Sequence, residues 1–140
     1  MKEIFIDTSA WDAIEDAKDP NHKMALTFAE IVAEKYHLVT TNFVLDETYT
    51  LLLMNVGYNC VLRFKHDIDE MSKLGVITVI HISERLEEFA WEIFEQFNVD
   101  KVWSFTDCTS KVVMEQNQID EVFAFDGDFE QMRFIRKPYI

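Results

Sequence analysis

Four carboxylates in this sequence stand where a charged side chain is costly. Asp7 and Asp126 directly follow short apolar runs, Glu47 lies within an apolar helical pattern, and Asp107 stands at the start of a helical segment. A carboxylate close to buried apolar residues must be paired, protonated or bound to a cation. Grouped carboxylates are hard oxygen ligands that suit Mg²⁺ or Mn²⁺, and these ions assist phosphodiester hydrolysis. The chemistry therefore depends on whether the four residues meet in space.

Asp7 and Asp126 also have ordinary structural roles open to them. Asp, Thr and Ser are all favoured before a helix, and we expect Ser9 to cap a helix over residues 9–17, which leaves Asp7 free for another task. Asp126 forms an Asp-Gly pair with Gly127, which is common in turns. Each residue is a weak signal by itself.

Asp107 has a structural alternative of the same kind. Together with Ser104 it matches the pattern of a capping box, in which both residues bond to backbone N–H groups in the first turn of a helix. That role explains Asp107 without any chemistry, so it stays open beside the metal-ligand interpretation.

Glu47 is more informative because its helical neighbours are apolar. At about 100° per residue, its face of the helix also holds Phe43, Val44, Leu51 and Met54. Asp46 points to the side and has the pattern of an ordinary surface acid, and the same solvent-facing role is the alternative for Glu47. The far face of the helix is apolar as well, which predicts a homodimer contact through Leu45, Tyr49 and Leu52.

Apolar runs and helical patterns alternate along the chain. Strands are expected at 3–6, 37–41, 76–81, 121–125 and 133–135, and helices at 9–17, 20–36, 42–56, 58–74, 83–97 and 106–118. This alternation predicts an α/β fold with a mainly parallel sheet covered on both faces. Because the carboxyl ends of parallel strands meet at one edge, the four carboxylates can converge there.

The bulk composition predicts one folded domain over residues 1–140. Hydrophobic residues make up 49% of the chain, with only 3 Gly and 2 Pro. The two cysteines, Cys60 and Cys108, fit a reducing compartment. No apolar run is long enough for a bilayer span, and the N-terminus has no signal-peptide pattern. We therefore expect a cytoplasmic protein with no membrane partner.

The formal net charge of −13 is unfavourable for binding nucleic acid. Attraction to phosphates normally comes from clustered Lys and Arg, and here only local patches at 63–66 and 133–137, or bound metal ions, could supply it. The same charge fits a basic protein partner. A surface that is acidic only for solubility is the plain alternative.

Three stretches of the sequence resemble a known family. They are IFIDTSAW near the N-terminus, TNFVLDETYTLL around Glu47, and SFTDCTSKVVMEQNQIDEVFAFDGDFEQM near the C-terminus. In their order and spacing the chain resembles a PIN domain, and more narrowly the VapC-type ribonuclease toxins of toxin–antitoxin pairs. The resemblance covers essentially the whole chain, and the C-terminal stretch is its most specific part.

The resemblance implies a three-layer α/β/α sandwich and an endoribonuclease that depends on Mg²⁺ or Mn²⁺, needing no His, Ser or Cys nucleophile. It implies an RNA substrate and a small antitoxin partner, whose Arg or Lys side chain could enter among the acids. The implied catalytic metal ligands are Asp7, Glu47, Asp107 and Asp126. The implied supporting residues are Asp128, a weaker ligand candidate, and Thr8, Ser104 and Thr106 as polar neighbours that orient a ligand or a water.

One position departs from the family pattern, and other protein classes remain as alternatives. Many PIN domains have a glycine where this chain has Arg133, which concerns the local turn rather than the metal ligands. A phosphatase of the haloacid-dehalogenase type would need a second Asp where Ser9 stands, and a receiver domain would need an acidic pair after the first strand. A PIN-like module that binds RNA or protein but cuts weakly or not at all is the main alternative to the nuclease.

Overall fold

Strands and helices alternate through residues 1–139, the part of the chain that the computed structural model describes. The elements are β1 (Lys2–Ile6), α1 (Thr8–Glu15), α2 (His22–Lys35), β2 (Tyr36–Thr41), α3 (Asn42–Asn55), α4 (Tyr58–Lys73), β3 (Ile77–Ile80), α5 (Glu84–Phe97), α6 (Phe105–Gln116), β4 (Glu121–Phe123), α7 (Asp128–Gln131) and β5 (Ile135–Lys137). None of the helices in this part of the chain is long and apolar enough to cross a bilayer.

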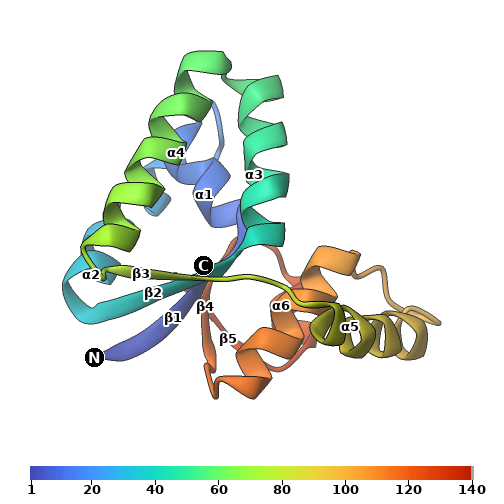
Figure 1. Cartoon of the computed structure of the whole chain (residues 1–140). Helices are drawn as coiled ribbons and strands as arrows, with labels where there is room; N and C mark the ends of the chain where they lie inside the picture. Colours follow the sequence, from blue (N-terminus) through green and yellow to red (C-terminus); the bar gives the residue numbers. More distant parts are fainter. Residues whose placement is uncertain (140) are drawn as a thin grey trace.

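The sheet has five strands in the order β3-β2-β1-β4-β5, and every pairing is parallel. Helices α1 to α4 cover one face and α5 and α6 cover the other (Figure 1). The expected α/β/α sandwich is therefore confirmed. The chain order reverses between β1 and β4, and in open parallel sheets ligands bind at the carboxyl ends of strands on either side of such a point.

The central strands are buried on both faces, which explains their continuous apolar runs. Ile4, Phe5 and Val122 have no exposed surface, and Phe123 is 1% exposed. The ring of Phe123 contacts that of Phe28 in α2 edge to face, with centroids 4.8 Å apart. Burial of a side chain of this size stabilises the fold by roughly 1.5–3 kcal/mol, so β1 and β4 form a firm base for the residues that follow them.

A buried ion cluster joins four strands near the amino edge of the sheet. Glu121 of β4 is 3% exposed, and its carboxylate accepts hydrogen bonds from Tyr36 of β2 at 2.7 Å and from Lys137 of β5 at 2.5 Å. Lys2 of β1 lies 2.6 Å from the second oxygen. Burial alone would raise the pKa of Glu121, but these hydrogen bonds outweigh it and lower the pKa to about 2.

The residues expected to form a homodimer contact on the far face of α3 are buried within the single chain, so this prediction of the contact residues is wrong. Leu52 has no exposed surface and Leu45 is 5% exposed within the single chain. Tyr49 packs edge to face on Phe64 of α4, with ring centroids 6.1 Å apart. The apolar face of α3 belongs to the core because α4 covers it.

The last two strands differ from their expected bounds. β4 ends at Phe123 instead of residue 125, and β5 covers 135–137 instead of 133–135. Arg133 lies in the turn after α7 with φ of 71°, a left-handed conformation that favours glycine. The backbone conformation at Arg133 therefore favours glycine, which is the residue that the family pattern has at this position.

The turn at Arg133 leads to a stability prediction. An L side chain in the left-handed region costs about 1–2 kcal/mol, and Arg133 is exposed with φ of 71°. Arg133→Gly should raise the free energy of unfolding by about 1 kcal/mol, measured by urea unfolding. Arg133→Ala keeps the Cβ atom and removes the charge, so it should change little. Equal stabilisation by both variants would attribute the effect to charge and contradict the conformational argument.

Candidate functional site

A hollow of about 500 Å³ lies at the carboxyl edge of the sheet, and we call it the carboxylate hollow. Its wall comes from the segments that follow β1 and β4, from α1, α3, α6 and α7, and from the segments that precede α2 and α6. The lining residues are Asp7, Thr8, Ser9, Asp12, Asp19, Asn21, Glu47, Leu51, Val102, Ser104, Asp107, Phe125, Asp126 and Asp128. Seven of these are acidic, and none of these lining residues is Lys, Arg or His.

Asp7 is the N-cap of α1, so the expectation that Ser9 would cap this helix is wrong. The Oδ2 atom of Asp7 accepts a hydrogen bond from the Ser9 backbone N–H at 3.1 Å and another from the Ser9 hydroxyl at 2.7 Å. The same hydroxyl accepts the N–H of Phe125 at 3.0 Å. Ser9 therefore joins the residue after β1 to the segment after β4, and Asp7 itself is only 3% exposed.

Asp107, Asp126 and Asp128 form the tightest group of carboxylates. Each offers an oxygen within 4.8 Å of the others. Asp107 is 7% exposed in the first turn of α6, and Asp126 accepts the backbone N–H of Asp128 at 2.9 Å. That bond shapes the turn at Gly127, so Asp126 has both its turn role and a place in the group. Asp128, expected only as a supporting residue, belongs to the same group.

Crowding and burial change the acidity of these residues. Burial raises the pKa of Asp7 to about 6, and the nearby Asp126 adds to the rise. Burial also raises the pKa of Asp107 to about 8, with further contributions from Asp7, Asp126 and Asp128. The pKa of Asp128 is raised by burial and by Asp126. Without a cation the site therefore holds protons that free carboxyl groups would release.

Glu47 and Thr8 reach the carboxylate hollow in different ways. Glu47 lines it from α3 but lies outside the group of three aspartates. Met54, expected on the same apolar stripe as Glu47, is 75% exposed. Thr8 is buried, and its hydroxyl donates to the carbonyl oxygen of Val44 at 3.5 Å, a long contact that joins α1 to α3.

Of the two supporting residues expected near Asp107, Ser104 lines the carboxylate hollow and Thr106 does not. The hydroxyl of Ser104 accepts the backbone N–H of Asp107 at 3.0 Å. The Ser104 half of the expected capping box is therefore present, whereas the described hydrogen bonds include none from a backbone N–H to the Asp107 carboxylate. Thr106 is not among the lining residues, and its carbonyl oxygen accepts a hydrogen bond from Thr109. The capping and site roles of Asp107 are therefore compatible, because its backbone forms the cap bond and its side chain faces the other aspartates.

The family model of the PIN domain matches residues 4–135. The chain belongs to the PIN domain family. This PIN domain is 36% identical over 133 residues to the 23S rRNA-specific endonuclease VapC20 of Mycobacterium tuberculosis, covering 94% of this chain and 95% of that protein. It is 28% identical over 127 residues to a VapC ribonuclease of Archaeoglobus fulgidus, covering 89% and 78% of the two chains. The expected kinship with VapC-type ribonucleases is confirmed.

Solved structures give the same relationship. The crystal structure of M. tuberculosis VapC20, described as a sarcin–ricin loop cleaving toxin, matches this PIN domain with a TM-score of 0.80 at 35% identity, covering 94% of this chain and 96% of that one. A VapBC2 complex from Rickettsia felis, bound to a DNA fragment from its promoter, matches with a TM-score of 0.68 at 13% identity, covering 96% and 97%. At that identity the second match shows the shared fold alone.

Two carboxylates of the hollow were not predicted from the sequence. Asp12 lies one helical turn after Thr8, so helix periodicity could have placed it beside the site, and one of its carboxylate oxygens is buried without a hydrogen-bond partner. Asp19 comes from the loop after α1, and no spacing rule in the sequence indicates its position. The nearby Asp19 adds to the effect of burial in raising the pKa of Asp12.

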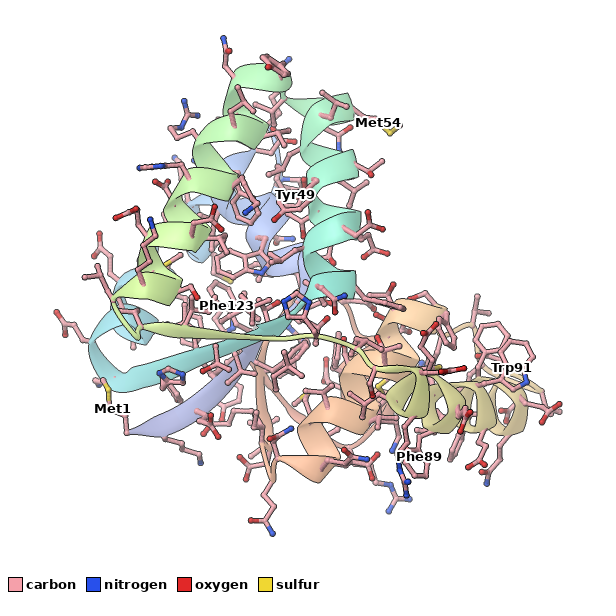
Figure 2. All side chains as sticks on the ribbon, viewed as in Figure 1. Met1, Tyr49, Met54, Phe89, Trp91 and Phe123 are labelled. Carbon is pink, nitrogen blue, oxygen red and sulfur yellow. The ribbon has the colours of Figure 1, made fainter. Side chains whose placement is uncertain are left out.

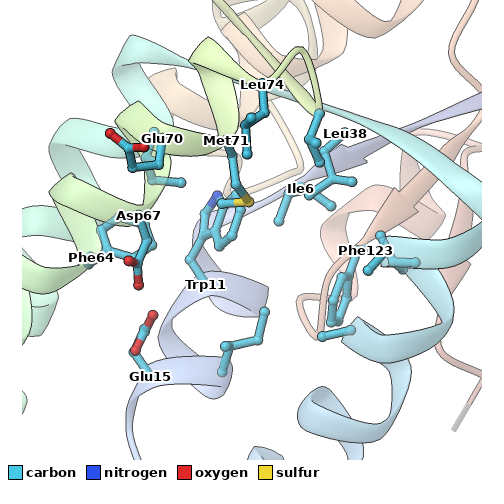
Figure 3. Close-up of a pocket in the computed structure, with 16 residues that line it drawn as sticks. Ile6, Trp11, Glu15, Leu38, Phe64, Asp67, Glu70, Met71, Leu74 and Phe123 are labelled. Carbon is cyan, nitrogen blue, oxygen red and sulfur yellow. The ribbon is translucent and has the colours of Figure 1, made fainter.

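A second hollow of this PIN domain, of about 440 Å³, has a different character. It lies between α1, α2 and α4 and is mainly apolar, and we call it the apolar hollow. Figure 3 shows Trp11 in its middle, with the carboxylates of Glu15 and Asp67 facing each other at one side. None of the four expected metal ligands lines it. The chemistry that the sequence predicts therefore belongs to the carboxylate hollow.

The raised pKa of Asp107 predicts how stability depends on pH in metal-free buffer. Between its ordinary pKa of 3.8 and its folded pKa of about 8, the folded protein holds a proton that the unfolded chain releases. Stability should therefore fall as pH rises through this window. Asp107→Asn should flatten this fall and leave the variant more stable than the wild type at pH 8, by about 1 kcal/mol or more, in urea titrations with a chelator present.

Asp46→Asn is the matched control for this measurement. Asp46 is an exposed acid on α3 that does not line the carboxylate hollow. Its variant should follow the pH dependence of the wild type. If the free energy of unfolding depends on pH in the same way for the wild type and Asp107→Asn, repulsion and burial at Asp107 do not affect folding.

Proposed function

We propose that this protein is a Mg²⁺- or Mn²⁺-dependent endoribonuclease and the toxin of a type II toxin–antitoxin pair. The observation that supports this most is the convergence of acids from separate parts of the sequence on one hollow that has no cationic residue in its wall. Such a wall needs a cation, and its hard oxygen donors suit the two proposed metals. The VapC relatives supply the reaction class.

The ligands proposed are Asp7, Asp107 and Asp126, with Glu47 from the facing helix. The raised pKa values of Asp7 and Asp107 mean that both carboxylates gain most from a nearby positive charge. Asp128 adds a further oxygen donor in the same group. Like Asp7, Glu47 lines the hollow outside the group of three aspartates, and we propose that it holds the ion through water, as Mg²⁺ sites commonly do.

The bound cation would activate water and neutralise charge at the scissile phosphate. The chain's own residues prepare that event. Ser9 holds the Asp7 carboxylate by two hydrogen bonds, and through Phe125 it fixes the segment that leads to Asp126. Thr8 ties this end of α1 to α3, the helix of Glu47. These residues position the ligands without touching the reacting atoms.

The first test is cleavage of RNA by the purified protein. With Mg²⁺ or Mn²⁺ the wild type should cut structured RNA, and addition of a chelator should stop the reaction. Asp7→Asn and Asp126→Asn should each lower the cleavage rate roughly 100-fold or more, because each removes a charged ligand. Cleavage products are measured on denaturing gels at several metal concentrations.

Asp46→Asn is again the control, since it removes an acid from the same helix as Glu47 but outside the hollow. It should cleave at the wild-type rate. Equal residual cleavage by the wild type and both ligand variants would refute the nuclease and leave the binding-only PIN module as the function.

The toxin role has a separate test in cells. Induced expression of the wild type in a bacterium should arrest growth, and Asp126→Asn should not, because the arrest depends on cleavage. If a small protein is encoded beside this gene, its co-expression should restore growth when the pair is a toxin and its antitoxin. Growth arrest of equal strength with Asp126→Asn would separate toxicity from the proposed chemistry.

A further inference from the structure

The acids of the carboxylate hollow account for only part of a nucleotide. Together with the ion that they are proposed to hold, they bind one phosphate group. In RNA each phosphate joins two nucleosides, and the ribose and base of a nucleoside carry no charge. The parts of the wall that are not acidic therefore decide which contacts the RNA makes beside the phosphate.

Three of the lining residues are apolar, and they differ in how much of their surface is free. Leu51 of α3 and Phe125 after β4 are partly buried. The Phe125 ring also packs edge to face on that of Phe123, with ring centroids 6.1 Å apart. Val102, in the segment between α5 and α6, is 93% exposed. Val102 is therefore the apolar side chain of the wall with the most surface left to cover.

The position of Val102 sets it apart from the other exposed apolar residues. Among the large apolar side chains of residues 1–139 it is the most exposed, and it is the one of the exposed group that lines the carboxylate hollow. Met54 on α3 and Trp91 on α5 are exposed elsewhere on the surface (Figure 2). A single exposed valine needs no explanation by itself, but this one lies in the wall of the site that the RNA must enter.

The backbone beside Val102 is firmly held. The Asn98 side chain bonds twice to Trp103, donating to its carbonyl oxygen at 2.9 Å and accepting its backbone N–H at 2.8 Å. The Trp103 indole N–H donates to Gln131 of α7 at 2.9 Å, and its ring stacks on that of Phe97 with centroids 5.1 Å apart. These contacts fix the residue next to Val102, so little conformational entropy is lost when Val102 makes a contact.

The segment that carries Val102 leads directly to the proposed metal ligands. Ser104 follows two residues later and accepts the backbone N–H of Asp107 at 3.0 Å. Asp107 belongs to the tight group of three aspartates. Val102 and the aspartates are therefore parts of one wall, joined by a short and hydrogen-bonded stretch of chain. A phosphate bound at the aspartates would have one of its two nucleosides beside Val102.

The chemistry of valine selects the part of the nucleotide that it contacts. A phosphate gains nothing from an isopropyl group, and its charge is balanced by the ion. The face of a base is apolar, and burying it against Val102 removes apolar surface of both partners from water. An aliphatic side chain makes no hydrogen bond to a base edge, so such a contact depends on the presence of a base more than on its identity.

On the basis of the proposed function, we propose that Val102 packs against the base of a nucleotide next to the scissile phosphate. The contact positions the RNA strand so that the phosphodiester bond lies over the acids. Val102 is then a substrate-positioning residue, which acts on RNA binding and not on the metal.

Steady-state cleavage kinetics test this contact on a short RNA hairpin that contains a cleavage site mapped for the wild type, at saturating Mn²⁺ or Mg²⁺. Val102→Ser should raise KM roughly 5- to 10-fold and leave kcat nearly unchanged, because it removes an apolar contact made equally before and during the reaction. Val102→Ile should keep the wild-type KM. The control is Val99→Ser, the same substitution at an 87%-exposed valine of the same segment that is not among the lining residues, and it should behave as the wild type.

Abasic substrates identify the base that is contacted. The same hairpin is prepared with an abasic ribose just before or just after the cleaved bond. The wild type should show a higher KM for one of these two substrates. On that substrate Val102→Ser should raise KM no further, because the base that Val102 contacts is already absent. A general distortion of the segment would not produce this coupling between the protein variant and one abasic position.

The outcomes separate this contact from the nuclease itself. If the wild type cuts no RNA with either metal, the proposed function fails and the contact fails with it. If the wild type cuts RNA but Val102→Ser keeps the wild-type KM, only the contact is refuted. The same rise in KM for Val102→Ser on the intact and both abasic hairpins would also refute it, since the residue would then act without touching a base. A changed Mn²⁺ requirement in Val102→Ser would assign the effect to the metal ligands instead.

Discussion

Seven carboxylates line one hollow at the carboxyl edge of the sheet, and their mutual repulsion acts against every element that holds them there. The repulsion is expressed in the raised pKa values of Asp7, Asp107 and Asp128. Buried strands β1 and β4 provide the opposing stability, since their side chains form the centre of the core. Ser9 adds a local restraint by bonding to both the Asp7 carboxylate and the Phe125 backbone.

The opposite edge of the sheet has the opposite electrostatics. There Glu121 is buried between Lys2 and Lys137 and accepts a hydrogen bond from Tyr36, so attraction joins β1, β2, β4 and β5. The two edges of the sheet therefore differ in how their charges are balanced. The edge at Glu121 is neutralised internally and stabilises the sheet, while the edge at the carboxylate hollow has no Lys, Arg or His among its lining residues.

This division explains how an acidic protein can be suited to act on RNA. The charge that is unfavourable for RNA at long range suits a hard divalent cation at short range, and this is the basis of the proposed metal site. The apolar hollow around Trp11 stands apart from the carboxylate hollow, and none of the four proposed metal ligands lines it.

The positions of most elements follow from local patterns in the sequence. Apolar runs marked the five strands, and helical periodicity marked α1 to α6 to within a few residues, because both signals depend on neighbours in the chain. The shift of β5 was not visible in this way. It depends on the turn at Arg133, where the backbone adopts a left-handed conformation that the sequence does not favour.

The four acids could also be singled out from the sequence, since a carboxylate next to a buried run or within an apolar stripe is costly wherever it occurs. Only the tertiary structure decided how they are arranged. The pairing of β1 with β4 brings residues far apart in the chain to one edge. There Asp126 and Asp128 meet Asp107, while Asp7 and Glu47 line the same hollow outside that group. Likewise, α4 covers the apolar face of α3 that had suggested a dimer. The type of a residue and its neighbours in the chain determine what it costs to bury, but only strand order and helix packing determine what it meets.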